Sequence, residues 1–288
     1  MIRRETYETA GPLRLRLELP VGRIDVETVD GTTTHVELEA ASDDMRSIVE
    51  EARIDCRERG NGHEVTVEVQ PRFGIFISFG RSQDIRLRVT CPPRAEVEVT
   101  TKSADLVARG RYGNVEMKTA SGDADIDDVG GEFLFKSASG DVHVARVGGG
   151  GRVQTASGDV AIDEIERDLS VQLVSGDLWV RDAHGSLTAN TVSGDQRIDA
   201  VDSGTMELRA VSGDLLIGVR RGSRVYVDAN TVSGSTSSEL DLSDGPPDDA
   251  DGGADDATAS LVEIRAKTVS GDIQIVRAPA RSTSLPAA

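Results

Sequence analysis

The carboxylates best placed to do chemistry in this 288-residue chain recur at a fixed spacing. A Ser-Gly-Asp tripeptide returns every 18 residues over five copies and after 19 residues in a sixth, which places Asp123, Asp141, Asp159, Asp177, Asp195 and Asp214. Glycine-rich and aspartate-rich nonapeptide repeats form calcium-binding rolls, and 18 is twice nine, so this column is a candidate calcium ladder. Calcium takes about six to eight oxygen ligands, however, and only one carboxylate per repeat is regularly placed. The spacing therefore favours a structural turn, with calcium binding as the alternative.

No other group of residues shows a catalytic spacing. The densest acidic group is Asp123, Asp125, Asp127 and Asp128. The histidines are His35, His63, His143 and His184. We expect the acidic group to be a solvated edge and the last two histidines to be ordinary surface residues, because the histidines recur at no ligand spacing. The sequence also lacks a glycine-rich phosphate loop, a nucleophile elbow and a Cys-His pair, so we predict no enzyme, no catalytic residue and no cofactor.

The stretches between the tripeptides show the period-two alternation typical of strands. Their alternating apolar residues include Phe133, Phe135, Val142, Val144, Val160, Ile162, Leu169, Val171, Leu173, Leu178, Val180, Met206, Leu208, Leu215 and Ile217. One 18-residue unit cannot bury its apolar face alone, so the pattern predicts an all-β, parallel β-solenoid of stacked coils about 4.8 Å apart. An antiparallel meander is the alternative, although nothing in it requires an identical turn at every second strand. The lone tryptophan, Trp179, is equated with Val144 and Ile162 and is expected in the core.

The glycine of each tripeptide is predicted to form a structural corner. These glycines are Gly122, Gly140, Gly158, Gly176, Gly194, Gly213 and Gly271. Glycine supplies the positive φ that a sharp bend needs, and Ser and Asp oxygens accept hydrogen bonds from amides that the turn leaves unpaired. Ser103-Ala104-Asp105 is interpreted as a degenerate first copy and Ser233-Gly234-Ser235 as a variant, so residues 101–238 are assigned to the solenoid.

Residues 1–100 are predicted to form a strand-rich capping section with one short helix. The helix is expected within residues 42–52, with Met45, Ile48 and Ala52 on one face and Ser42 or Asp43 as its cap. Residues 53–59 and 64–70 are expected to pair as a hairpin around Gly60-Asn61-Gly62.

An apolar cluster interrupts this section between Arg72 and Gly80. Its members are Phe73, Ile75, Phe76, Ile77 and Phe79. A strand in the core or end-cap is the favoured interpretation, and an interaction patch for a partner, a second copy or a membrane surface is the alternative.

The C-terminal part is predicted to interrupt and then complete the solenoid. Residues 239–258 carry eight acidic and no basic side chains, which is typical of a disordered insertion. Residues 259–277, with Ser270-Gly271-Asp272, are expected to form the final coil, and residues 278–288 a flexible tail. With little chain after it, this coil would expose a strand edge suited to end-to-end association.

These features resemble a known family. The N-terminal Gly22-Arg23-Ile24-Asp25-Val26, a later strand ending in Pro92-Pro93 and the Ser-Gly-Asp repeats are together similar to the bacterial putative-adhesin family of β-strand-repeat proteins of unknown function. The resemblance covers about residues 10–276. It implies a right-handed parallel β-solenoid with a structural or adhesive role, and it brings no catalytic residues.

Composition limits the partners. A net charge of −18 and only 3% aromatic residues disfavour nucleic acid and anionic lipid. No run of 18 apolar residues predicts a transmembrane segment and no signal peptide is recognised, so a cytoplasmic location is expected, with signal-less export as the alternative. For Cys56 and Cys91, two unbridged thiols are favoured over one disulfide.

We therefore expect a non-catalytic scaffold or adhesin-like protein that acts through its surface or its ends. Its partner is expected to be another protein, or a second copy bound through the solenoid ends. Calcium binding is the first alternative. Carbohydrate binding or processing is less favoured, because it calls for an acidic groove lined with aromatic side chains and the chain has few of these.

Overall fold

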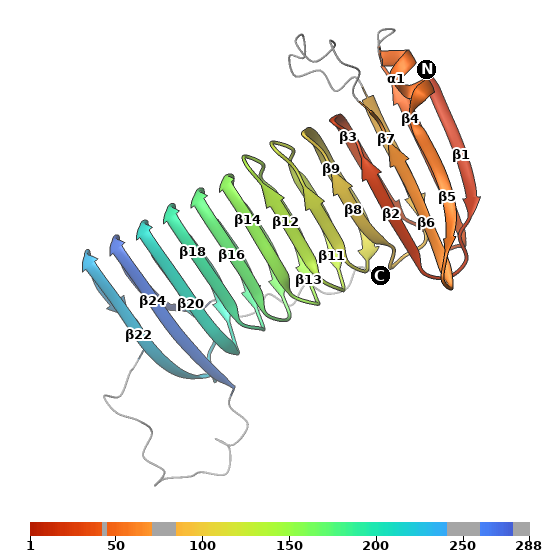
Figure 1. Ribbon diagram of the computed structural model, residues 1–288. Helices are drawn as coiled ribbons and strands as arrows, with labels where there is room; N and C mark the ends of the chain where they lie inside the picture. The colour runs from red at the N-terminus through yellow and green to blue at the C-terminus, as the bar shows by residue number, and fades with distance from the viewer. Residues whose placement is uncertain (42–44, 71–84, 241–259, 279–288) are drawn as a thin grey trace. The chain divides into compact units, whose positions relative to one another are not determined.

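The computed structural model describes residues 1–41, 45–70, 85–240 and 260–278 (Figure 1). The chain divides into two compact units, Met1–Ile162 and Asp163–Ala288. In both units, parallel strands pair in register at the spacing of the tripeptide repeat, so the parallel β-solenoid is confirmed and the meander is excluded. The apolar cluster Phe73, Ile75, Phe76, Ile77 and Phe79 lies outside the described residues, as do nearly all of the acidic insertion and the tail.

The repeating part of the first unit consists of two strands per coil, one in each of two sheets. One sheet contains β3 (Val21–Thr28), β9 (Ser103–Tyr112), β11 (Ala124–Val129) and β13 (Val142–Val147), in that order. The other contains β2 (Leu13–Glu18), β8 (Glu96–Thr100), β10 (Val115–Lys118), β12 (Phe133–Ser137) and β14 (Gly151–Ser157). The boundary between the units falls within β15 (Val160–Ile165). Register pairs such as Ala124↔Val142 and Val115↔Phe133 repeat the 18-residue period of the sequence.

The core of this unit lies between its two sheets, because every second side chain of each strand points inward. Phe133, Phe135, Val142 and Val144 are each at most 2% exposed. The rings of Phe133 and Phe135 stack with centroids 6.4 Å apart. Burying a side chain of this kind contributes about 1.5–3 kcal/mol, so the repeated inward row is the main source of stability in each coil.

The N-terminal section ends the parallel stack with antiparallel strands. β7 (Ile85–Cys91) pairs in parallel with β3 and antiparallel with β4 (Thr33–Ala40), which pairs antiparallel with β1 (Ile2–Glu8). In the other sheet β6 (Gly62–Glu68) pairs in parallel with β2 and antiparallel with β5 (Arg53–Arg59), which confirms the predicted hairpin.

The predicted helix is present as α1 (Arg46–Glu51), which contacts β4 and β1. Met45, Ile48 and Ala52 are buried, as expected from their spacing. The capping prediction is wrong, because Met45 occupies the N-cap position and makes no side-chain capping bond. Ser42 and Asp43 lie outside the described residues.

The second unit repeats the two-strand coil. One sheet has the order β16 (Leu169–Ser175), β18 (Leu187–Ser193), β20 (Gly204–Ser212), β24 (Leu261–Ser270) and β22 (Arg224–Ser233). The other has the order β17 (Leu178–Ala183), β19 (Gln196–Val201), β21 (Leu215–Val219), β25 (Ile273–Arg277) and β23 (Thr236–Ser238). Figure 1 shows β20, β24 and β22 lying side by side in this order.

This order corrects the prediction that the C-terminal coil ends the solenoid. Ser270 of β24 is paired with Ser212 of β20 on one side and with Ser233 of β22 on the other. The last coil of the sequence is therefore inserted between two coils that precede it in the chain. Sequence spacing did not show this, because parallel pairing depends on matching side chains and not on the order in which the coils are made.

Trp179 is a second correction, since it lies outside the core. Leu178 and Val180 are buried at 1% and 0% exposure, whereas Trp179 between them is half-buried and its Nε1 donates a 2.8 Å hydrogen bond to Asp199 Oδ2. The residue one 18-residue period after Ile162 is Val180, so the prediction was out of register by one residue. Such a slip moves a strand side chain to the opposite face.

Both cysteines are free thiols. Cys91 is buried, and burial raises the pKa of its thiol to about 12. Cys56 is half-buried, and burial also raises the pKa of its thiol. Among the described residues, no helix is long and apolar enough to cross a membrane.

Candidate interaction surface

The aspartates of the tripeptides form a hydrogen-bonded ladder in each unit. In the first unit, the amide of Asp141 donates to Asp123 Oδ1 at 2.9 Å, and the amide of Asp159 to Asp141 Oδ1 at 2.8 Å. The ladder begins at Asp105, whose Oδ1 accepts the Asp123 amide at 3.1 Å. Ser103-Ala104-Asp105 thus acts as the first copy of the repeat, as its sequence indicated.

The same ladder runs through the second unit. Asp195 donates its amide to Asp177 Oδ1, and Asp214 to Asp195 Oδ1, both at 2.8 Å. Asp272 continues the ladder by donating to Asp214 Oδ1 at 2.8 Å. One carboxylate oxygen of each rung is therefore engaged by the backbone of the next coil, which supports the structural interpretation of these residues.

The ladder of the second unit stops where its aspartate is replaced. Ser235 stands at the aspartate position of the variant tripeptide, and its amide and hydroxyl both donate to Asp272 Oδ1, at 2.7 and 2.9 Å. These bonds lower the pKa of the Asp272 carboxyl. Since no described coil follows the one that contains Ser235, no further amide needs an acceptor at this position.

The glycines occupy corners where stacked backbones touch. A Cβ on Gly140 would lie 2.2 Å from the carbonyl oxygen of Gly122, and a Cβ on Gly194 would lie 2.1 Å from that of Gly176. The φ of Gly194 is +141°, as predicted for a bend, but Gly140 is not among the residues of positive φ. The close approach of one coil to the next is therefore the requirement that these corners share.

The acidic group at the start of the repeats is held by arginines. Arg109 of β9 pairs with both Asp125 and Asp127 of β11, and the Arg109 hydrogen bond lowers the pKa of Asp125. Asp128 pairs with Arg146 at 2.7 Å. Three of the four carboxylates in this group are therefore paired with arginines, and the fourth, Asp123, accepts an amide.

The histidines are also engaged individually. His143 Nδ1 lies 3.1 Å from Asp125 Oδ1. His184 is the most enclosed, with Nδ1 2.8 Å from Asp202 Oδ2 and Nε2 3.4 Å from Glu164 Oε1. His35 and His63 contact Thr6 Oγ1 and the Ala10 carbonyl oxygen. Within the described ranges, no group of three or more His, Cys, Asp or Glu side chains is placed to hold a metal ion.

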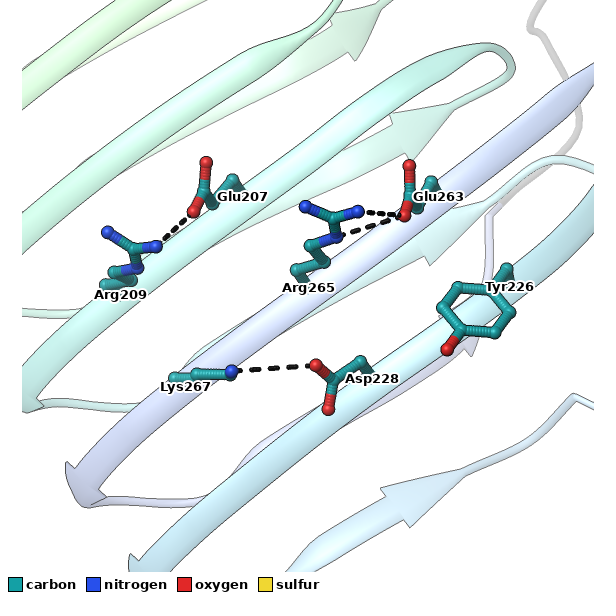
Figure 2. A pocket seen from close by; sticks show the side chains of 7 residues that line it. All are labelled: Glu207, Arg209, Tyr226, Asp228, Glu263, Arg265 and Lys267. Atoms are coloured by element: carbon teal, nitrogen blue, oxygen red, sulfur yellow. Dashed lines mark hydrogen bonds and ion pairs between the residues drawn. The ribbon is translucent and has the colours of Figure 1, made fainter.

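A shallow hollow of about 400 Å³ lies on the outer face of β20, β24 and β22 (Figure 2). Its charged side chains pair within the hollow, as Glu207 with Arg209, Glu263 with Arg265 at 2.6 Å, and Asp228 with Lys267 at 3.6 Å. The seventh lining residue, Tyr226, is 60% exposed and the only aromatic one. The surface is thus charge-balanced and lacks the paired aromatic faces that would favour a sugar.

A column of exposed valines follows the tripeptides of the second unit. Each valine directly precedes the serine of one tripeptide, and in spatial order they are Val174, Val192, Val211, Val269 and Val232. They are 49–52% exposed, except for Val232 in the end coil at 79%. Their serines are register neighbours in the parallel sheet, so the valines stand about 4.8 Å apart in one line.

The first unit has alanines at the equivalent positions. Ala120, Ala138 and Ala156 precede its tripeptides, and all three are exposed. This difference was not predicted, although it is visible in the sequence as the residue before each tripeptide. The two units therefore share a corner geometry and differ in how apolar its outer side is.

Comparison with known proteins identifies a family. The model of the family described as Toastrack DUF4097 matches residues 15–276. A search of curated proteins gives no match.

Several solved structures are similar at low sequence identity. One is a putative lipid binding protein from Parabacteroides distasonis, with 13% identity, a TM-score of 0.42, and coverage of 96% of this chain and 97% of that chain. Another is a putative adhesin from Bacteroides fragilis, with 10% identity, a TM-score of 0.36, and coverage of 96% and 97%. A third is a putative cell adhesion protein from Clostridium sporogenes, with 10% identity, a TM-score of 0.32, and coverage of 96% and 100%.

Proposed function

The chain belongs to the Toastrack DUF4097 family, and we propose that it is a non-catalytic β-solenoid scaffold that binds a protein partner along its valine column. The observation that carries this proposal is the line of half-exposed valines in the second unit, each about 4.8 Å from the next. Single exposed apolar side chains are common on protein surfaces, whereas a contiguous apolar line is characteristic of a contact surface.

The chemistry of the surroundings supports a protein partner. One oxygen of each carboxylate near the column accepts a backbone amide, as Asp195 Oδ1 does from Asp214, and the described residues bring no cluster of ligands together for a cation. The net charge of −18 repels nucleic acid. An apolar line suits a partner that brings its own row of aliphatic side chains.

Site-specific photo-crosslinking in cells tests this function. A photoreactive amino acid at position 192 should give a discrete covalent product with one partner protein, and the same amino acid at position 138, the alanine position of the first unit, serves as the matched control. The product should disappear when Val174→Ala and Val211→Ala are introduced beside position 192. Equal products from both positions, or none from position 192, would contradict the proposal.

The location of the chain in the cell distinguishes an internal scaffold from an adhesive protein at the cell surface. We propose an internal, cytoplasmic scaffold, and fractionation of cells into cytoplasmic, membrane and external material checks it. Recovery of the chain at the cell surface would favour an adhesive role for the same valine column.

A further inference from the structure

The coil formed by β22 and β23 ends the second unit with an open strand edge. β22 pairs with β24 on one side, and no described strand lies on its other side. Its inward side chains Val225 and Val227 are half-buried, whereas their register partners Val262 and Ile264 in β24 are fully buried. The end coil therefore has core side chains and backbone groups that no further described coil covers.

The open edge carries little of the charge that usually protects an edge strand. Only Arg224 and Asp228 are charged among the ten residues of β22. In the first unit, the edge strand β5 has five charged residues out of seven, and the edge strand β1 has four out of seven. β22 is thus unlike the other long edge strands in being open to strand pairing.

The backbone of β22 shows which groups face outward. The amide of Arg224 donates to the Ser260 carbonyl, so Arg224 directs its backbone groups toward β24. Every second residue of a strand directs its amide and carbonyl to the same side, so the other even-numbered residues of β22 also face β24. Residues of the other parity, Val225, Val227, Ala229 and Thr231, therefore point theirs to the open edge. A new strand placed there would find four hydrogen-bonding positions at alternate residues.

We infer that β22 pairs antiparallel with β22 of a second copy of this chain, about a two-fold axis through Ala229. This inference goes beyond the proposed function, because it concerns the open end of the second unit and not its valine column. The opposed residues are then Ala229 with Ala229, Val227 with Thr231, Asp228 with Asn230, and Tyr226 with Val232.

This register is selected by the side chains. Among the unit's described residues, Tyr226 at 60% and Val232 at 79% are the most exposed large apolar side chains, and this register places them opposite one another. The symmetry makes the contact twice. An axis at Asp228 would oppose two like charges, and an axis at Asn230 would oppose Tyr226 to Gly234. An axis between two residues would place inward side chains on the outer face.

Val227, Ala229 and Thr231 of each strand form three hydrogen-bonded pairs about this axis. The apolar Tyr226–Val232 contacts fall at the closer, non-hydrogen-bonded positions. Because each copy carries a net charge of −18, the association should strengthen as salt screens the repulsion.

The mass of the full chain, measured by light scattering over a concentration series, tests the inference. The wild-type mass should rise two-fold toward that of a dimer, and Ala229→Pro should abolish the rise. Proline removes an amide that faces the open edge and leaves the pairing with β24 intact, so the melting temperature should change little. A wild-type chain that is monomeric at every concentration, or an A229P dimer as strong as wild type, would overturn the inference.

Cysteine cross-linking tests the register directly, and it does not depend on how well A229P folds. In a C56S/C91S background, the double variant Tyr226→Cys/Val232→Cys should form a disulfide-linked dimer under mild oxidation, whereas each single variant should not. Cross-linking of either single variant alone to the same extent would refute the axis at Ala229.

Failure of this inference and failure of the proposed function give different results. The Val174→Ala/Val211→Ala double variant should abolish the cross-link from position 192 and leave the dimer unchanged, because both positions lie on strands away from the open edge. A229P should abolish the dimer and leave the cross-link from position 192 in place.

Discussion

The amide of Asp272 donates a 2.8 Å hydrogen bond to Oδ1 of Asp214, although 58 residues separate the two in the chain. Everywhere else along the ladders described above, the donor and acceptor aspartates are 18 or 19 residues apart. The bond from Asp272 to Asp214 has the same length as the bonds between aspartates of consecutive repeats. The position of a coil in the stack therefore depends on its backbone pairing and its Ser-Gly-Asp turn, and not on its order in the chain.

The corner glycines should tolerate no side chain, because the next coil is too close. We expect Gly140→Ala to lower the free energy of unfolding by about 1–3 kcal/mol, since its Cβ would lie 2.2 Å from the Gly122 carbonyl oxygen. Thermal unfolding followed by circular dichroism measures this. The matched control is Gly130→Ala, whose Cβ would lie 3.5 Å from its nearest neighbour; an equal loss in both variants would contradict the explanation.

The ladder aspartates should stabilise the coils as acceptors and not through their charge. We expect Asp195→Ala to cost about 1 kcal/mol, because the Asp214 amide loses its acceptor. Asp195→Asn keeps an oxygen at that position and removes like-charge repulsion, so it should be neutral or stabilising in denaturant unfolding. Asp30→Ala, at an exposed position outside the ladder, is the control. If Asp195→Asn were as unstable as Asp195→Ala, the acceptor role would be refuted.

Calcium should leave the stability of the chain unchanged. One Oδ1 of each rung already accepts an amide hydrogen bond, and the described residues hold no cluster of ligands for a metal ion. Melting temperatures measured with excess calcium and with a chelator should therefore agree. A rise with calcium that is lost in Asp195→Asn would restore the calcium ladder.

The Arg14–Glu98 pair should make stability depend on pH in the acidic range. The 2.7 Å hydrogen bond from Arg14 lowers the pKa of Glu98 below its unfolded value, so its contribution is fully present above the unfolded pKa of about 4.3. The contribution is lost as pH falls through the lowered pKa of the folded state.

Denaturant unfolding of Glu98→Gln against wild type across this range checks the sign. The variant should be less stable by up to about 1 kcal/mol at neutral pH, and the difference should shrink as the solution is acidified. Glu132→Gln at an exposed position should show no such trend. A difference that stays constant down to strongly acidic pH would contradict the assignment.

The two thiols should differ in reactivity. Cys91 is fully buried and its thiol pKa is about 12, so it should react with a thiol reagent only after unfolding, while half-buried Cys56 should react slowly in the native state. With a reagent that releases a chromophore for each thiol it modifies, the absorbance of the released chromophore gives the number of reactive thiols. Native labelling should vanish in Cys56→Ser, and labelling of Cys91 at the same rate as Cys56 would show that the core around it opens.

Much of the fold could be predicted because the repeat length determines which residues pair between neighbouring strands. The 18-residue spacing and the alternation at Val142 and Val144 identified the parallel coils, and Gly60-Asn61-Gly62 identified the hairpin. Trp179 was misplaced because it was aligned with Ile162, whereas the 18-residue period aligns Val180 with Ile162, and a slip of one residue reverses the face of a strand.

The candidate site was less accessible from sequence. The aspartates were found as a column, but their acceptor role depends on the amide of the following coil, which the spacing alone does not supply. The valine column was missed because Val192 and its counterparts continue the apolar composition of the strands, and only the structure shows them on the outer face. The change from Asp to Ser at Ser235 is the sequence signal that marks the last coil in space.

The insertion of β24 and β25 between older coils also matters for synthesis. A ribosome releases β22 and β23 before it releases the strands on which they rest. Until translation reaches Arg277, β22 lacks the neighbour that holds it in the sheet, and only β20 and β21 mark where the growing stack has stopped. The sheets of the second unit are therefore complete only after β24 and β25, which are synthesised last, insert between the coil of β20 and β21 and the coil of β22 and β23. Assembly of this region thus differs from the coil-by-coil growth that the repeat would otherwise permit during translation.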